Sequence, residues 1–197
     1  MSNSEPDQEP QANKDLGQIL AELEKSGDGQ SLPPVDKWNP DFCGDMDLVI
    51  KRDGSWHYQG SPIGRQRLVK LFSTVLKNED DKYYLVTPVE KLGIRVEDAP
   101  FLVIRMTVKD TAVGPVISFE DNCDNQIMLT KDNPIWVEHD SKTGEPSPYI
   151  MVRRNLHALI HRNVFYELVE RAEERVIDDK KHLGVISAGE FFSLGTI

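Results

Sequence analysis

The chain has 197 residues, 39% of them hydrophobic, and a formal net charge of −10. This length suits one large domain or two small ones, and the apolar content excludes a wholly disordered chain. Because the average surface is acidic and repels phosphate polymers, we expect no non-specific binding to duplex DNA.

The absence of long apolar segments narrows the class of protein further. No apolar run is long enough to span a membrane and no signal peptide pattern is present, so the sequence predicts a cytoplasmic protein. Cys43 and Cys123 share no metal-binding spacing, which indicates free thiols. We therefore expect neither a cofactor nor a metal.

The first 44 residues are predicted to lie outside the compact units. Residues 1–13 lack apolar periodicity and are expected to form a disordered leader. In residues 14–44, the pattern "DLGQILAELEK" predicts an N-terminal helix, and the prolines of "SLPPVDKWNP" predict an extended crossing segment. Trp38 is expected to anchor this segment by packing, with a ligand contact as the less favoured alternative.

A first α+β unit is predicted for residues 45–100. The Asp-Gly pair in "KRDGSW" lies between alternating segments and predicts a two-residue hairpin turn. Ser61 suits a helix N-cap and Pro62 the first helical position, so a helix is expected near residues 64–77. The segment "YYLVT" then returns as a strand.

A second α+β unit is predicted for residues 101–197. Short apolar segments from "FLVIRMTV" to "PYIMVR", separated by Asp, Asn, Gly and Pro, predict strands. The amphipathic stretch "NLHALIHRNVFYELVERAEERVI" predicts the main helix, near residues 159–174, before two final strands. The expected fold is therefore α+β, with two related units of small antiparallel sheet and one main helix each.

A weak internal repeat supports this division into related units. At an offset of 97 positions, "PIGRQRLVKLF" aligns with "LIHRNVFYELV", and Arg65 falls on Arg162. An acidic stretch and an apolar strand follow each predicted helix. We infer a duplication in which the two helices occupy equivalent places.

The long stretch "LPPVDKWNPDFCGDMDLVIKRDGSWHYQGSPIGRQRLVKLFSTVL", followed by "YYLVTPVEKLGIRVEDAPFLV" and "PYIMVRRNLHALIHRNVFYELVE", resembles the bacterial family called domain of unknown function 1285. The resemblance covers roughly residues 30–197. It implies two related α+β domains, the second similar to pleckstrin-homology-like folds. It also implies a pocket at the domain interface for a nucleotide-based ligand in signal transduction.

Catalytic motifs are absent from the sequence. It contains no GxSxG, no Walker loop, no GxGxxG and no HExxH. His157 and His161 would share a face of a helix, but no further ligand completes a zinc set. Asp45 and Asp47 are interpreted as solvated edge residues rather than cation ligands.

Arg65 is the first candidate for ligand binding. It lies in the first turn of a predicted helix, where a cation opposes the helix dipole. Either an acidic partner, such as Glu90 or Asp80, or a bound anion is expected beside it. For the turn "GSPIGR" itself, capping of the helix is favoured over anion binding.

Three further pairs complete the candidate site. Glu90 and Lys91 lie in a connection that forms either a recognition surface or a salt-bridged turn, and adjacent Arg153 and Arg154 at a strand end point to opposite sides. The last pair is aromatic and consists of Trp56 and Tyr58, two positions apart on one predicted strand. Their side chains either pack in a core or stack on the base of a ligand.

The expected function is that of a non-enzymatic ligand-binding or regulatory protein. In this hypothesis these seven residues surround a nucleotide-like anion between the two halves. A protein–protein interaction adaptor is the first alternative, and an enzyme of unrecognised type is the second.

Overall fold

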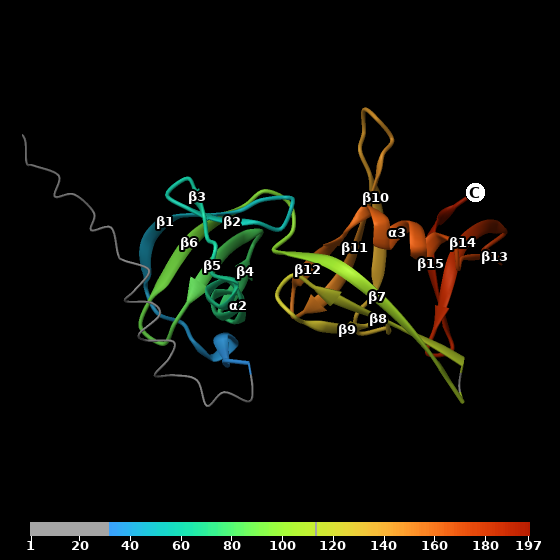
Figure 1. Ribbon diagram of the computed structural model, residues 1–197, viewed down its shortest axis with the longest axis horizontal. Coiled ribbons are helices and arrows are strands. Elements are labelled where there is room, and N and C mark those ends of the chain that lie inside the picture. Colours follow the sequence, from blue (N-terminus) through green and yellow to red (C-terminus); the bar gives the residue numbers. More distant parts are fainter. Residues whose placement is uncertain (1–31, 113) are drawn as a thin grey trace, which may run out of the picture.

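The computed structural model describes residues 32–112 and 114–197 (Figure 1). The predicted leader, 1–13, and the predicted N-terminal helix lie outside the described residues. In the described part the fold is mostly β, with two α-helices and two six-stranded sheets that lie side by side (Figure 1). The prediction of two units is confirmed, whereas the share of helix is smaller than expected.

The first sheet is formed by residues 42–96 and has the strand order β3-β2-β1-β6-β5-β4. Its central strands, β1 and β6, run parallel, and the other pairs are antiparallel. The elements in chain order are β1 (Phe42–Ile50), β2 (Trp56–Tyr58), β3 (Ser61–Pro62), α2 (Gln66–Thr74), β4 (Leu76–Glu79), β5 (Lys82–Val86) and β6 (Lys91–Val96).

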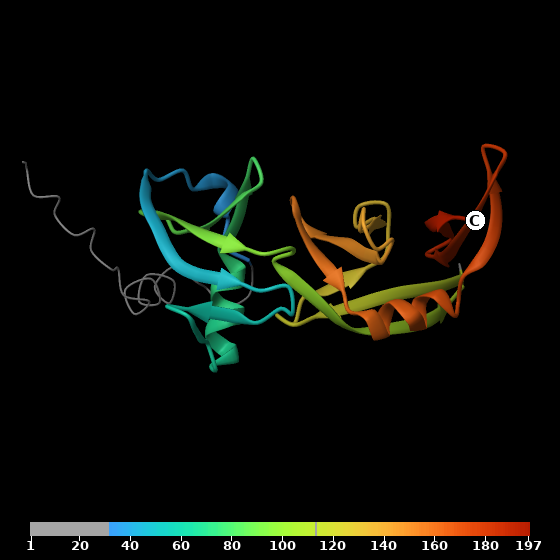
Figure 2. The same ribbon diagram turned by 90° about the horizontal axis from the view of Figure 1, so that it is seen from above.

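The second sheet is formed by residues 101–160 and has the order β10-β11-β12-β7-β8-β9, with β7 and β12 as the parallel central pair. Its strands are β7 (Phe101–Thr111), β8 (Gly114–Asp121), β9 (Gln126–Met128), β10 (Ile135–His139), β11 (Pro146–Arg153) and β12 (Leu156–Ile160). Helix α3 (Arg162–Val169) follows and lies along β7 (Figure 2). A three-stranded sheet closes the chain with β13 (Glu173–Ile177), β14 (Lys180–Ser187) and β15 (Glu190–Thr196).

The two six-stranded sheets share one architecture. In each sheet, the first three strands follow one another in order from the centre to one edge. The next three follow in order from the opposite edge back to the centre, where the sixth strand pairs in parallel with the first. This is the similarity between halves that a duplication predicts. The sheets are therefore equivalent strand by strand, β1 with β7 and β6 with β12.

The predicted equivalence of the two helices is wrong. Helix α2 connects the third and fourth strands of its sheet, whereas α3 follows the sixth strand of its own. Arg65 and Arg162 therefore do not occupy matching places in the two units. The internal repeat at an offset of 97 positions has a local cause instead, because each helix leads into a hairpin with an Asp-Asp turn.

These two turns have the same geometry. Asp80 and Asp81 join β4 to β5, and Asp178 and Asp179 join β13 to β14. All four residues have φ between 49° and 61°, as the central positions of a type I′ hairpin turn require. Only the first hairpin belongs to a six-stranded sheet, so the same local sequence signal serves two different places in the fold.

The predicted helix start at Ser61 and Pro62 is also wrong. These residues form β3, and the backbone N–H of Ile63 extends the pairing by donating to the Trp56 carbonyl at 2.8 Å. The helix begins at Gln66, with Arg65 as an N-cap residue that makes no side-chain capping bond. The glycine turn of this segment, at Gln59 and Gly60, is a hairpin turn rather than a helix cap.

The second predicted helix divides into three elements. Residues expected to begin it form strand β12, α3 takes the middle, and the last part is β13. His157 is therefore on a strand and His161 is the N-cap of α3, so they do not share a helix face. Alternation of buried and half-buried residues in β12 matches a period of two better than a helical period.

Two shorter segments also differ from expectation. The segment predicted as extended contains a 3-10 turn, η1 (Val35–Lys37), although Trp38 does pack against the core as expected. The hairpin at Asp53 has a three-residue loop, because Lys51 N–H bonds to the Ser55 carbonyl and Gly54 N–H to the Lys51 carbonyl, both at 2.9 Å. The hairpin itself was correctly predicted.

The hydrophobic core is continuous through both units. At the junction, Gly54 approaches the second unit so closely that a Cβ atom there would lie 2.9 Å from Leu102 Cβ. Asn122 fixes this approach by donating to the Gly54 carbonyl at 2.8 Å and accepting from the Leu102 N–H at 3.0 Å. The side chain of Asn122 thus joins the backbones of the two units.

Arg153 makes a partly buried polar contact across the junction, to the end of α2. Its guanidinium donates to the Ser73 carbonyl at the end of α2 and to Asn125 Oδ1, each at 2.7 Å, and lies 4.8 Å from the Phe101 ring centre. The neighbouring Arg154 pairs with exposed Asp36 at 2.7 Å. One arginine therefore connects the interiors of the units, and the other connects their surfaces.

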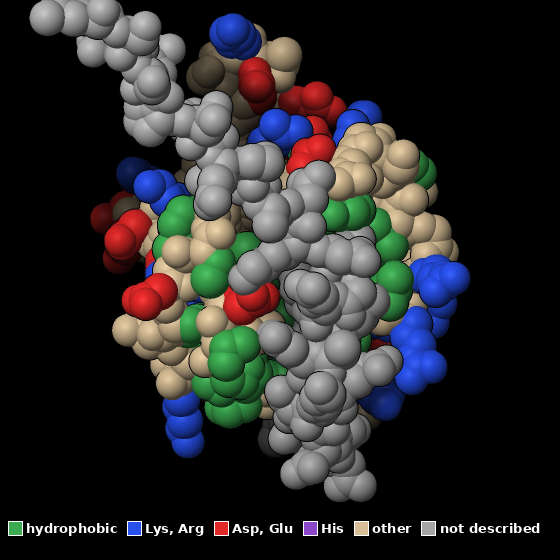
Figure 3. Space-filling model, turned by 90° about the vertical axis from the view of Figure 1, so that its left-hand side faces the viewer, with side chains coloured by type: hydrophobic (Ala, Val, Ile, Leu, Met, Phe, Trp, Pro, Cys, Tyr) green, Lys and Arg blue, Asp and Glu red, His purple; other side chains and the backbone are tan. Residues whose placement is uncertain are grey.

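The outer end of the first unit is mixed in charge. In Figure 3, Lys and Arg side chains gather along one margin of this end, and most of the visible Asp and Glu side chains lie elsewhere on it. Positive and negative side chains are therefore not evenly mixed over the visible part of this end.

We expect Arg153→Ala to lower the free energy of unfolding by about 3 kcal/mol, because it leaves a partly buried carbonyl and amide oxygen without their charged donor. Arg154→Ala is the matched control and should cost about 1 kcal/mol or less, since its partner is exposed. Urea unfolding of both variants measures this difference. Equal losses would contradict the assignment of Arg153 as the interior connection.

Candidate functional site

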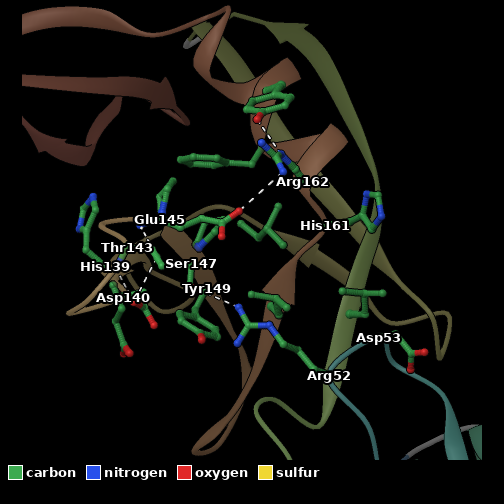
Figure 4. A pocket seen from close by; sticks show the side chains of 18 residues that line it. Arg52, Asp53, His139, Asp140, Thr143, Glu145, Ser147, Tyr149, His161 and Arg162 are labelled. Carbon is green, nitrogen blue, oxygen red and sulfur yellow. Dashed lines mark hydrogen bonds and ion pairs between the residues drawn. The ribbon is translucent and has the colours of Figure 1, made fainter.

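A cavity of about 890 Å³ lies at the junction of the two units (Figure 4). The first unit contributes the β1–β2 turn, with Arg52 and Asp53. The second contributes the β10–β11 hairpin, β12 and the first turns of α3. The volume lies within the range of about 300–1,000 Å³ that is usual for small-molecule sites.

Arg52 forms one cationic wall of the cavity. Its Nη1 lies 2.6 Å from Asp98 Oδ2, and Nη2 donates to Ser147 Oγ at 2.9 Å. Tyr149 donates from its hydroxyl to the other oxygen of Asp98 at 2.8 Å. Burial, together with this carboxylate, raises the pKa of Tyr149 to about 12, so the phenol remains a donor at neutral pH.

Arg162 extends from the opposite wall (Figure 4). Its Nε donates to the Tyr166 hydroxyl at 2.6 Å, and its guanidinium lies 5.4 Å from the centre of that ring. Its Nη1 lies 3.6 Å from Glu145, and both side chains of this pair are about two-thirds exposed. Such a long, exposed ion pair is weak and is easily exchanged for a contact with another anion.

His161 and Asp140 organise the two backbone segments that border the cavity. His161 caps α3 by accepting the Asn163 N–H on Nδ1 at 3.3 Å. Asp140 accepts the N–H groups of Lys142 and Thr143 at 2.9 and 2.7 Å, and these bonds lower the pKa of its carboxyl group. The β10–β11 turn is therefore held in a defined conformation.

The lining combines cations, carboxylates and aromatic rings. Two arginines and two histidines face four carboxylates, those of Asp53, Glu138, Asp140 and Glu145, beside three aromatic side chains, Tyr149, Phe165 and Tyr166. Such a surface suits a molecule that carries both an anionic group and hydrogen-bond donors. Within the described ranges, no group of three or more His, Cys, Asp or Glu residues could hold a metal ion.

None of the seven residues predicted from the sequence lines this cavity. Trp56 is only 2% exposed and belongs to the core, and Tyr58 packs partly against it. Because Trp56 is buried, it offers no free ring face for stacking on a ligand, and the core alternative holds for it. Trp56 and Tyr58 lie two positions apart on β2, as predicted.

Glu90 and Lys91 lie at the turn between β5 and β6, away from the junction cavity. Lys91 pairs with Glu79 at 2.9 Å and lies 5.1 Å from the Tyr84 ring centre. Hydrogen bonds from Lys77 and Lys91 lower the pKa of Glu79. For Lys91 the salt-bridged alternative therefore describes the structure.

The predicted arginines are separated by the fold. Arg65 is exposed at the start of α2, whereas Arg153 and Arg154 make the contacts between the units described above. The expectation that adjacent Arg153 and Arg154 point to different places is met, although neither lines the cavity. Arg162, noticed in the sequence as the partner of Arg65 in the repeat, does line it.

The sequence contained a weak signal for one missed residue. Arg52 occupies a hairpin turn, "KRDG", and turns held by a rigid scaffold often carry binding residues. Its role depends on Asp98 and Ser147, which are 46 and 95 positions away, respectively, and only the fold brings them together.

The fold and the cavity define a class of protein with two similar β-sheet units and a pocket where they meet. The chain belongs to the DUF1285 family, a family named for a domain of unknown function. The N-terminal domain of this family matches residues 33–99, and its C-terminal domain matches residues 100–194.

Two solved structures of this family are similar to the chain. A DUF1285 family protein from Silicibacter pomeroyi DSS-3 is 44% identical, with a TM-score of 0.80 over 91% of this chain and 95% of that one. A DUF1285 family protein from Shewanella baltica OS155 is 25% identical, with a TM-score of 0.51 over 64% of this chain and 91% of that one. Both names give only the family and the organism, and neither states an activity.

No curated protein matches the chain. Among the helices of the described residues, none is long and apolar enough to cross a membrane.

His157 gives the region beside the cavity a pH dependence. Its ring packs 5.7 Å from Trp136 and 5.4 Å from Tyr149, and burial lowers its pKa despite nearby Asp98, Glu138 and Asp81. Because the folded state disfavours the charged ring, stability present above the ordinary histidine pKa of about 6.5 should be lost as pH falls below it. We expect this loss to be smaller in His157→Phe, measured by urea unfolding between pH 8 and pH 5. Identical pH profiles would contradict it.

The two free thiols should differ sharply in reactivity. Cys43 is exposed, whereas burial and the Asp121 carboxylate raise the pKa of Cys123 to about 12. A thiol reagent at pH 8 should therefore modify Cys43 rapidly and Cys123 only when the junction opens or the protein unfolds. Counting of modified thiols by mass, with Cys43→Ser as the control, measures this. Rapid modification of Cys123 in the folded protein would show that the junction is open in solution.

Proposed function

We propose that the protein is a non-enzymatic ligand-binding protein whose junction cavity binds a small nucleotide-like anion. The observation that carries this proposal is the position of Arg52 and Arg162 on opposite walls of one cavity built from both units. A guanidinium can hold two phosphate oxygens at once, which suits it to this task. The resemblance of the sequence to its family, which implies a pocket for a nucleotide-based ligand at the domain interface, supports the same proposal.

The two arginines would contribute differently to binding. Arg52 is already oriented by Asp98 and Ser147, so it presents a fixed donor. Arg162 would exchange its long contact with Glu145 for the anion. Carboxylates that line the cavity, such as Asp53 and Glu138, would accept hydrogen bonds from hydroxyl or amino groups of the same molecule.

The finer features implied by the resemblance belong to this proposal. We propose that the second unit, with its six-stranded and three-stranded sheets on either side of α3, is pleckstrin-homology-like. We propose further that the protein acts in the cytoplasm in signal transduction, and that it does not bind duplex DNA non-specifically. The acidic net charge of the chain supports the last point.

A protein-interaction adaptor is the second candidate function. The observation that favours it is strand β13, all five residues of which are exposed and which pairs only with β14 in its sheet. Such an edge can add an extended segment of another protein as a further strand.

The ligand-binding proposal predicts that nucleotides raise the melting temperature of the protein. Arg162→Ala should weaken binding by roughly 10-fold to 150-fold, the loss expected for one charge-assisted contact of about 1.5–3 kcal/mol. Arg65→Ala is the control, because Arg65 is exposed outside the cavity. Titration calorimetry with each nucleotide that gives a shift measures the affinities.

Two outcomes would contradict the proposal. If a broad panel of nucleotides produces no thermal shift, the nucleotide-like ligand is wrong. If Arg65→Ala weakens binding and Arg162→Ala does not, the ligand lies at the start of α2 and not in the junction cavity.

A further inference from the structure

A second cavity, of about 360 Å³, lies within the second unit. It is bordered by the β10–β11 hairpin, α3 and the C-terminal sheet. Most of its walls are aliphatic or aromatic, from Val137, Phe165, Val169, Leu183 and Leu194. This second cavity is partly open to solvent, and its volume exceeds the roughly 150 Å³ that holds a benzene ring, so it has room for an apolar group.

The two cavities adjoin each other. His139, Pro146 and Phe165 line both of them. Phe165 is 8% exposed and projects from α3 one turn after Arg162, so a cation and an apolar surface follow each other on the same helix. The polar cavity and the apolar one are therefore neighbours that share one wall.

We propose that the ligand is an amphiphile, with its anionic group between Arg52 and Arg162 and an unbranched apolar chain in the second cavity. This rests on the proposed function and specifies the chemical class of the ligand. The proposed occupant is a single-chain molecule free in solution, whose chain passes the shared wall at His139, Pro146 and Phe165.

Solvation favours an apolar occupant over water. A bound water needs two to four polar partners, and the side chains that line the second cavity supply few besides His139 and Thr196. Transfer of a chain from water into this space gains free energy with each methylene buried. The arginines fix the position of the head, and the apolar cavity selects for the presence and length of the chain.

A series of n-alkyl phosphates tests the proposal. Inorganic phosphate and butyl, hexyl and octyl phosphate, each below its micelle concentration, are titrated into the full chain by calorimetry. We expect the affinity to rise by up to about fourfold per methylene until the second cavity is full. Nucleotides should compete with every member of the series, because they share the head-group position.

Substitutions that fill the second cavity provide the specific control. Val169→Phe, from the α3 wall, should remove the dependence on chain length and leave the affinity for inorganic phosphate unchanged. Leu183→Phe, from the opposite wall, repeats the test if the first variant does not fold. Val176→Phe is the matched control, since Val176 is 69% exposed on β13 and lines neither cavity.

The outcomes separate this proposal from the proposed function. Equal affinities along the series, with nucleotides still bound, would overturn the amphiphile and leave the nucleotide-like site intact. An increase with chain length that survives both filling substitutions would place the chain elsewhere and overturn it as well. Binding only to phosphatidic acid vesicles, and not to the free alkyl phosphates, would overturn a ligand free in solution. No binding of phosphate, alkyl phosphates or nucleotides would overturn both proposals.

Discussion

The contact between Arg153 and the end of α2 is the interaction on which the arrangement of the two units depends. Burial removes much of the hydration of the Arg153 guanidinium, and its two terminal nitrogens compensate by donating to Asn125 Oδ1 and the Ser73 carbonyl beside the Phe101 ring. Its buried Nε has no hydrogen-bond partner among the described residues. Asn125 is held in turn by Asp121, which is fully buried and accepts both its backbone and side-chain N–H groups. Burial raises the pKa of the Asp121 carboxyl group, and nearby Arg153 opposes that rise. Each of these groups is tolerated in the interior because the others are present.

The position of the cavity follows from the shared sheet architecture. In both sheets the first and last strands pair in parallel at the centre, so the segment that links the sheets leaves β6 and enters β7, both central strands. Asp98 lies in this link and receives both Arg52 and Tyr149. The β1–β2 turn is thereby held against the second unit, and the space that remains between this turn, the β10–β11 hairpin and α3 is the cavity.

Local signals in the sequence predicted most elements correctly but not their places. The Asp-Gly hairpin, the apolar faces of the helices and most strands depend on neighbouring residues, which a sequence displays directly. The Ser-Pro helix cap failed because strand pairing with Trp56 extends as far as Ile63 and competes for the same backbone groups. The repeat misled in a similar way, since a helix followed by an Asp-Asp turn is a local unit that can be placed anywhere in a sheet. Arg153 could not be assigned from sequence, because its partner Ser73 lies 80 positions away.

The contrast between the two cavity arginines indicates how binding could occur without movement of the units. Arg52 is bonded to Asp98 and Ser147, groups that also hold the junction, so it cannot leave them without loosening the contact between the sheets. Among the described residues, Arg162 makes polar contacts with Tyr166 on its own helix and, at 3.6 Å, with the exposed Glu145. An anion that enters the cavity therefore meets one fixed cation and one that can exchange its partner at little cost. Preorganisation by the first and adjustment by the second would confine the change on binding to the Glu145 side of the cavity, and the sheets would keep their positions.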